Sequence, residues 1–505
     1  MLGLLAATPP LRVSSSPRGL LCSPSCRSLT TPSPRPPASR WTPPLLSLAP
    51  HASPLPAPPP LLAHAEDFFR RRGVRLHAAP PARPGSRTTS RIAVRASPHG
   101  GAALLGLFAP GTHQVVPCAA DERCHAPHHP AINAAIGVLA RELDAFAALS
   151  AYDERRGDGT LRYVQLSVER RTARVQLTLV ANAAAADDDP ALPRFAARLW
   201  RRHAAALHSV WLNFNPSRGN NILSYAPAAW QLAHAHADGV VAGGSLLERF
   251  PSGASFVLPP FVFRQGNLDD FDRVVAQVCA AVPRGARVCE WYAGVGVLGL
   301  SLARRAEWVR CSDINPPYEA FHASRELLPP RCRGRVSYAV GAAADRLADA
   351  VGADVAVVDP PRKGLDAELR DALCDRSEGA PCAGLHTLVY VSCGFPALMS
   401  DVDALLAAGW RIRGQKAMAH ILFVGANHIE TVVVFERSLN PSRGGDGARP
   451  AVASAMRQGK ERGLSREPTR REAKQPVLAR VDAKSTSKTT KRPRRHRESP
   501  RKTPR

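Results

Sequence analysis

The first 65 residues contain no Asp, Glu or Lys and only five Arg, while Ser, Pro, Ala and Leu are abundant. This composition is typical of an organelle transit peptide. The alternative is a Pro-rich disordered extension without a targeting function, and neither kind of segment can form a hydrophobic core. The Ser and Pro content favours the chloroplast over the mitochondrion, so we expect residues 1–65 to be transit peptide-like.

The chain also lacks a regular cysteine framework and long apolar runs. Its 11 cysteines are scattered over 505 residues, which is typical of a reducing compartment and not of a secreted disulfide scaffold. A membrane-spanning helix needs about 18 or more apolar residues in succession, and the sequence has no such run. We therefore expect no membrane span, and separately we expect a monomer.

Net charge is absent from the middle of the chain, although the whole carries +25. Residues 1–100 hold 13 Arg and 2 acids, residues 438–505 hold 20 Lys and Arg and 6 acids, and residues 101–437 hold 34 of each sign. The charge therefore concerns the tails and their partners, and not the fold. We expect 438–505 to be a disordered basic tail, whose run at 491–497 serves either RNA contact or nuclear import.

Periodicity divides the chain between its tails into a linker at 66–100, a smaller α/β domain at 101–256 and a catalytic domain at 257–437. In the smaller domain, apolar residues at helical spacing predict helices at 131–149 and 195–207. Alternation of apolar and polar residues predicts a hairpin of 161–169 with 172–180, and a further strand is predicted at 209–214. In the catalytic domain, alternating strands and helices predict a Rossmann-like doubly wound α/β sheet. Its predicted strands are 287–292, 308–314, 336–340, 355–359, 387–392, 411–418 and 430–436.

A glycine-rich turn, with Gly294, Gly296 and Gly299, follows the first of these strands. Glycine lets a backbone approach a ligand closely, and Asp313 at the next strand end suits a ribose hydroxyl. This pattern alone also describes a nicotinamide site or a turn without ligand. Glu290 favours S-adenosylmethionine, because a carboxylate suits its cationic methionine end and would repel a pyrophosphate.

Two further motifs end strands at the same edge of the predicted sheet. In Asp359-Pro360-Pro361-Arg362 the prolines stop the strand and hold a stiff loop, which places the acid and the arginine over the cofactor crevice; an ordinary Asp-Pro turn is the alternative. Cys393 ends the next strand, either as a small packed hydrophobic residue or as a nucleophilic thiolate.

Four ordered segments resemble the RNA uracil-C5 methyltransferase family, which includes the bacterial transfer-RNA and ribosomal-RNA m5U enzymes. They are Phe263-Arg264-Gln265-Gly266-Asn267, Asp359-Pro360-Pro361-Arg362, Tyr390-Val391-Ser392-Cys393 and His428-Ile429-Glu430-Thr431. The resemblance covers roughly residues 101–437 and implies a class I S-adenosylmethionine-dependent methyltransferase fold. It further implies roles for six residues: cofactor contact for Gln265, Tyr292, Asp313 and Asp359, nucleophile for Cys393, and base for Glu430.

The chemistry of uracil explains why these residue types are needed. C5 is too poor a nucleophile to take a methyl group unaided, and addition of a thiolate at C6 makes it enolate-like. A base must then remove the C5 proton, for which Glu430 is suited, while Arg362 is placed to hold the uracil or its enolate oxygen. The target uridine, in tRNA or rRNA, has to be unstacked to reach the pocket.

Several positions depart from the family pattern and indicate a divergent branch, of plant or algal type. Gly394-Phe395 stand where Asn-Pro is common, Ala293 stands where Cys is common, a polar residue is missing near Val297, and a proline is missing before His428. Residues 66–100 are too short for the RNA-binding β-barrel of many relatives. We therefore expect the basic tails to bind RNA through its phosphates.

Three other functions and one metal site remain as alternatives. An RNA cytosine-C5 methyltransferase would also use a cysteine but does not require Glu430. A non-catalytic RNA-binding protein would not need both Cys393 and Glu430, and Glu290 argues against a nicotinamide enzyme. Cys118, Cys124 and nearby histidines resemble the family's Cys-x-x-His-His-Pro stretch, which we interpret as structural, so we expect no metal.

Overall fold

The computed structural model describes residues 59–97, 102–109, 111–118, 122–219, 221–237, 242–314 and 318–438. Most of the transit peptide-like segment, and the basic tail beyond residue 438, therefore lie outside the described residues. Within the described part, two large sheets and one hairpin are formed. Its helices include none with both the length and the apolar character needed to cross a bilayer.

An eight-stranded sheet contains the seven strands predicted for the catalytic domain and one more. Its members are β1 (Arg75–Ala78), β11 (Arg287–Trp291), β12 (Trp308–Asp313), β13 (Val336–Val340), β14 (Val355–Val358), β15 (Thr387–Ser392), β16 (Arg411–His420) and β17 (Glu430–Glu436). Their order across the sheet is β1-β16-β17-β15-β14-β11-β12-β13, and only β17 is antiparallel to its neighbours. This confirms the predicted Rossmann-like α/β fold. The strand order reverses at β11, and in such folds ligands bind at the carboxyl ends of the strands beside that reversal.

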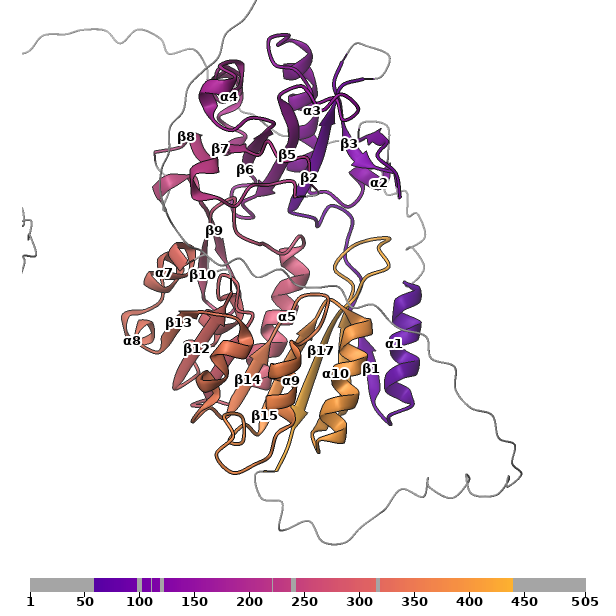
Figure 1. Ribbon diagram of the computed structural model, residues 1–505, viewed down its shortest axis with the longest axis vertical. Coiled ribbons are helices and arrows are strands. Elements are labelled where there is room, and N and C mark those ends of the chain that lie inside the picture. The colour runs from indigo at the N-terminus through magenta and orange to yellow at the C-terminus, as the bar shows by residue number, and fades with distance from the viewer. Residues whose placement is uncertain are drawn as a thin grey trace, which may run out of the picture. The chain divides into compact units, whose positions relative to one another are not determined.

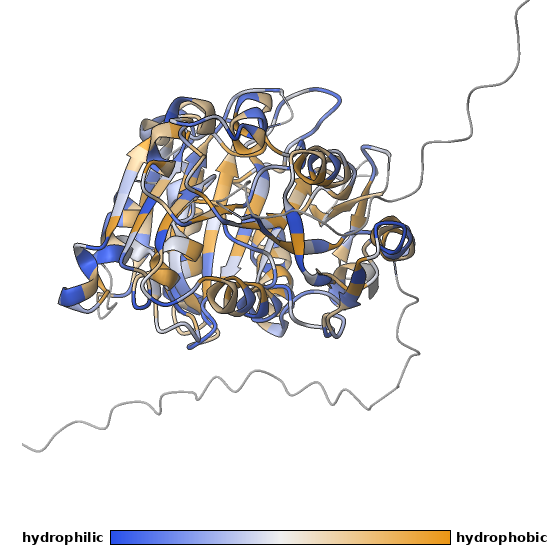
Figure 2. Ribbon diagram, turned by 90° about the horizontal axis from the view of Figure 1, so that it is seen from below, coloured by the Kyte–Doolittle hydropathy of each residue, from blue (hydrophilic) through white to orange (hydrophobic). Residues whose placement is uncertain are grey.

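Helices cover both faces of this sheet (Figures 1 and 2). One core includes Val288 and Val357 with α5 (Leu268–Ala281), α6 (Val297–Leu302) and α7 (Tyr318–Glu326). The other includes Cys289 and Val358 with α1 (Pro60–Arg70), α9 (Ala367–Cys374) and α10 (Phe395–Ala407). The central strands β14 and β15 are buried along their whole length, as is typical of the continuous runs in parallel sheets. All seven predicted strands begin at the predicted residue and end within two residues of the predicted end.

A seven-stranded sheet forms the smaller α/β domain, also as predicted. Its members are β2 (Thr89–Arg95), β3 (Leu104–Phe108), β4 (Val115–Pro117), β5 (Leu161–Val168), β6 (Val175–Ala181), β7 (Leu207–Phe214) and β8 (Trp230–Ala235). The order is β4-β3-β2-β5-β6-β7-β8, with the predicted hairpin as β5–β6. Side chains of α3 (Pro130–Asp144) and α4 (Ala191–His203) share one core with these strands.

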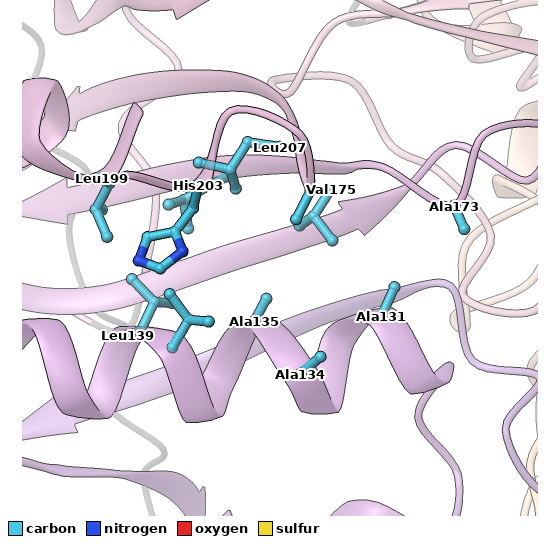
Figure 3. A pocket seen from close by; sticks show the side chains of 12 residues that line it. Ala131, Ala134, Ala135, Leu139, Ala173, Val175, Leu199, His203 and Leu207 are labelled. Atoms are coloured by element: carbon cyan, nitrogen blue, oxygen red, sulfur yellow. The ribbon is translucent and has the colours of Figure 1, made fainter. Parts of the chain in front are cut away.

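A cavity of about 40 Å³ lies between α3 and α4 (Figure 3). Its lining is apolar apart from His203, and the facing side of α3 presents the short side chains of Ala131 and Ala135. An apolar space of this size has too few polar partners to hold water well. We therefore treat this cavity as a packing defect and not as a ligand site.

Two predicted domain boundaries need correction. The linker predicted at 66–100 contributes to both sheets, because β1 pairs with β16, β2 pairs with β5, and α1 spans the boundary at residue 65. The boundary near Phe256 falls inside a hairpin of β9 (Leu246–Arg249) and β10 (Ser255–Leu258). Phe256 packs into the core of the eight-stranded sheet, so the hairpin belongs to the catalytic domain.

Candidate active site

The glycine-rich turn after β11 is held from two sides. Gly294 and Gly296 have φ values of 55° and 78°, in the left-handed region that favours glycine. The Gly294 N–H donates to Asp313 Oδ2 (2.9 Å), and the Tyr338 hydroxyl donates to the Gly294 carbonyl (2.7 Å). The predicted Asp313 therefore fixes the loop itself. Tyr338 was not predicted, because a single tyrosine on β13 carries no local motif.

Glu290 lies beneath this turn and not on its open side. A Cβ added at Gly299 would collide with Glu290 Oε2 and Cys311 Sγ, so the carboxyl occupies the space that the glycine leaves. Burial raises the pKa of Glu290 to about 7. The expected contact with the cationic end of a cofactor is not supported by this position, because strand β11 directs Glu290 toward α6.

Tyr292 connects two loops at the carboxyl edge of the sheet. Its backbone is in the left-handed region, with a φ of 60°, which is costly for a bulky residue and is often found at functional sites. The hydroxyl donates to Asp366 Oδ2 and accepts from the Asp366 N–H, both at 3.1 Å. Tyr292 thus fixes the end of the loop that Asp359 begins. Gln265 is half-buried on the segment between β10 and α5.

The loop that begins with Asp359 packs tightly against the residue after Cys393. A Cβ added at Gly394 would overlap the backbone of Arg362, so this contact requires glycine. The departure of Gly394 from the family pattern therefore has a structural reason. Burial, and then the neighbouring Glu430 and Glu290, raise the pKa of Asp359 well above its usual value.

Cys393 and Glu430 lie at the ends of two neighbouring strands. The antiparallel register of β15 and β17 ends with Ser392 paired with Thr431. Cys393 is the first residue after β15, and Glu430 is the first residue of β17. Glu430 is buried, and its Oε1 is 3.3 Å from His428 Nε2.

The surroundings of Cys393 disfavour its thiolate. Burial, then Glu430 and Asp359, raise the pKa of the half-buried Cys393 thiol to about 11, while Arg362 acts in the opposite direction. The structure thus brings Cys393, Glu430 and Asp359 into one electrostatic cluster. A thiol, two carboxyls and a glycine-rich turn at one edge of the sheet can support covalent catalysis with proton removal.

Two exposed apolar side chains were not predicted. Ile314 follows β12 and is 63% exposed, and Val340 ends β13 and is 55% exposed. They are close because β12 and β13 pair Asp313 with Val340. Exposed apolar side chains beside Asp313 can pack against a flat ring, although each is an ordinary strand-end residue in the sequence.

The cysteine and histidine stretch has no role at this edge. Cys118 and Cys124 form a disulfide in the core of the smaller domain. His128 Nε2 is 2.8 Å from Ser90 Oγ on β2. Among the residues that the structure describes, no group of three or more His, Cys, Asp or Glu is arranged to hold a metal.

Comparison with known proteins finds sequence relatives and solved structures with a similar fold. No family model matches the chain. An uncharacterized RNA methyltransferase of Protochlamydia amoebophila is 31% identical over 363 residues, which are 70% of this chain and 86% of that protein. Another, of Gloeobacter violaceus, is 30% identical over 347 residues, or 67% of each chain. The Pyrococcus abyssi tRNA (uracil-54, C5)-methyltransferase, solved with S-adenosyl-L-homocysteine, has a TM-score of 0.53 at 19% identity and covers 74% of this chain and 83% of its own. The predicted methyltransferase fold is thereby confirmed.

Proposed function

This chain belongs to the RNA methyltransferases, and we propose that it methylates C5 of a uridine, with S-adenosylmethionine as the methyl donor. The observation that supports the proposal is that Cys393 and Glu430 adjoin the last pair of the β15–β17 ladder, Ser392 with Thr431, and that the charge of Glu430 acts on the Cys393 thiol. A methyltransferase acting on a heteroatom of RNA needs neither a cysteine nor a paired carboxyl. Chemistry at a pyrimidine C5 needs a nucleophile for C6 and a base for the C5 proton.

The residues at the strand ends fit the proposed cofactor. A Cβ built on Gly294 meets no atom within 4 Å, so the turn has space beside it on its open side. Asp313 is suited to the ribose hydroxyls, and the exposed Ile314 and Val340 to the adenine ring. Asp359 is suited to the cationic methionine end, the role that Glu290 does not fill in this arrangement.

In the proposed reaction, the chain's own residues act in three steps. The Cys393 thiolate adds to C6 of the uracil, and C5 thereby becomes nucleophilic. When bound, S-adenosylmethionine would supply the electrophilic methyl group that C5 takes, with S-adenosylhomocysteine as the leaving group. Glu430 then removes the C5 proton, and elimination breaks the bond between C6 and sulfur and frees Cys393. Arg362 lies on the loop beside Gly394 and is suited to the uracil oxygen that gains charge.

The covalent step gives a direct test. Glu430→Gln should accumulate a protein–RNA adduct that survives denaturation, because the C5 proton stays in place. Cys393→Ala should form none, and Cys374→Ala, which changes a half-buried free cysteine on α9, should behave like the wild type. An adduct that persists in Cys393→Ala would contradict the assignment of the nucleophile.

The RNA and the compartment are also proposed. We expect an unstacked uridine of tRNA or rRNA as the target, a monomer as the active form, and phosphate contacts from the tail at 438–505. If deletion of 438–505 left RNA affinity and its salt dependence unchanged, the tail would not bind RNA. Residues 1–65 fused to a fluorescent protein should direct it to chloroplasts, and fluorescence in mitochondria or the nucleus would contradict that location.

A further inference from the structure

The N-terminal segment 59–88 contacts the loops around each proposed catalytic residue. Its helix α1 packs on Phe395, which is two residues after Cys393. The Phe395 ring lies 5.7 Å from the ring of Phe68, edge to face, and 6.1 Å from that of Phe69. Phe69 and Phe395 are both fully buried. The position of the first turn of α10 therefore depends on rings that the N-terminal segment supplies.

An ion pair extends this contact along α10. Arg72 donates two hydrogen bonds to Asp403, from Nε at 2.7 Å and from Nη2 at 2.8 Å. Arg72 also donates to the Phe68 carbonyl (2.9 Å), and its guanidinium lies 3.6 Å from the centre of the Phe68 ring. A two-point arginine–carboxylate contact fixes orientation as well as distance. It sets the rotation of α1 against α10.

The same segment contacts both ends of the loop that leads to Glu430. The Leu61 N–H donates to Oδ1 of Asn427 at 2.9 Å. Asn427 lies three residues before Glu430 in the chain. After β1, the Ala79 N–H donates to the Ala419 carbonyl (2.7 Å) and the Ala82 N–H to the Ile421 carbonyl (3.0 Å). The loop from Ile421 to Ile429 is thus fixed at each end by the N-terminal segment.

The last part of the segment contacts the motif that contains Gln265. The Thr88 N–H donates to the Gly266 carbonyl at 2.7 Å. Asn267 Nδ2 donates both to Ser86 Oγ (3.0 Å) and to the Leu422 carbonyl (2.8 Å). One buried amide therefore joins the N-terminal segment, the cofactor motif and the loop before Glu430.

From these contacts we infer that the N-terminal segment 59–88 positions the catalytic residues, with Phe69 and Asn427 as positioning residues for Cys393 and Glu430. The inference rests on the proposed function for the roles of those two residues. Phe395 is the first residue of α10, and the ring cluster with α1 fixes its position. Reaction geometry is sensitive to displacements of about 1 Å, so a loosened loop slows the chemistry even when ligands still bind.

The first test compares two buried phenylalanines in the full chain. Phe69→Leu loosens the cluster on Phe395, and Phe195→Leu is the matched control, because Phe195 is equally buried in the smaller domain and packs on Phe146 at 5.4 Å. We expect Phe69→Leu to lower kcat about tenfold and to change the rate of Cys393 alkylation at least about threefold, with the affinity for S-adenosylmethionine unchanged. Phe195→Leu should lower the melting temperature similarly and change neither rate.

The second test uses an exposed position that does not endanger folding. Asn427→Ala removes the acceptor of the Leu61 N–H and should lower kcat about threefold, without changing Cys393 alkylation. Asn427→Asp keeps that oxygen and should restore kcat. If Phe69→Leu matched Phe195→Leu in both rates, or Asn427→Ala matched the wild type, the inference would be wrong.

These experiments distinguish a failure of the proposed function from a failure of the proposed positioning role. Alkylation of Cys393, measured by mass spectrometry of its peptide, needs no RNA and no turnover. If the wild type produced no 5-methyluridine while the alkylation contrast between Phe69→Leu and Phe195→Leu held, the proposed function would fail and the positioning of Cys393 would stand. If 5-methyluridine formed at equal rates in both variants and alkylation did not differ, the positioning role would fail alone.

Discussion

Glu430→Gln should lower the pKa of the Cys393 thiol. Burial, Glu430 and Asp359 together raise that pKa from 9.0 to about 11, with burial as the largest cause. At pH 8 a pKa of about 11 leaves roughly one thiol in a thousand ionised, against about one in ten at 9.0. Because Glu430 is the first cause after burial, removal of its charge should lower this pKa and raise the thiolate fraction about threefold or more.

The assay is the rate of Cys393 alkylation by iodoacetamide between about pH 7 and pH 12, followed on the Cys393 peptide. Glu436→Gln is the matched control, because Glu436 lies at the other end of β17 and pairs with Arg413. In Glu436→Gln, the Cys393 thiol should have the same pKa as in the wild type. If Glu430→Gln had the wild-type pKa, or if both variants shifted it equally, the electrostatic coupling of Cys393 and Glu430 would be refuted.

Three further predictions concern packing and pH. Gly394→Ala should reduce methyl transfer about 100-fold in single-turnover measurements, because its Cβ overlaps the Arg362 backbone; Gly334→Ala, where the added Cβ meets no atom within 4 Å, should have no effect on the rate. Glu290→Gln should raise the free energy of unfolding above pH 7 by about 1–3 kcal/mol and leave it unchanged below about pH 4.5, as checked by urea denaturation. The sign follows because the unfolded carboxyl ionises near 4.5, whereas burial raises the pKa of the folded carboxyl to about 7, so the destabilisation builds up between these pH values and is complete above about pH 7. Ala135→Val should stabilise the protein by about 0.5 kcal/mol in the same assay, because filling about 40 Å³ gains roughly 1 kcal/mol and valine in a helix loses about half of it.

The centre of the catalytic sheet could be predicted because β14 and β15 are buried on both faces. Such strands are apolar throughout, and the helices between them have a different period. The edge that holds Asp359 and Cys393 followed from the rule that parallel strands place their carboxyl ends together. Glu430 came from the ordered family motifs, and its position close to Cys393 became visible only in the register of β15 with β17, which ends at Ser392 and Thr431.

The N-terminal contribution could not be predicted in the same way. Strand β1 has four residues, and α1 begins in a Pro-rich stretch, so neither produces a clear periodic signal. Their partners lie far along the chain, as with Leu61 and Asn427, which are separated by 366 residues. The orientation of Glu290 was also hidden, because alternation does not tell which face of a fully buried strand meets the ligand.

The central claim is that the chain methylates C5 of uridine in RNA. The most direct measurement incubates the purified full chain with unmodified tRNA and rRNA and with S-adenosylmethionine that carries a deuterated methyl group, followed by mass spectrometry of the nucleosides. The account predicts labelled 5-methyluridine with the wild type and none with Cys393→Ala. Label in 5-methylcytidine or another nucleoside, with none in 5-methyluridine, would contradict it.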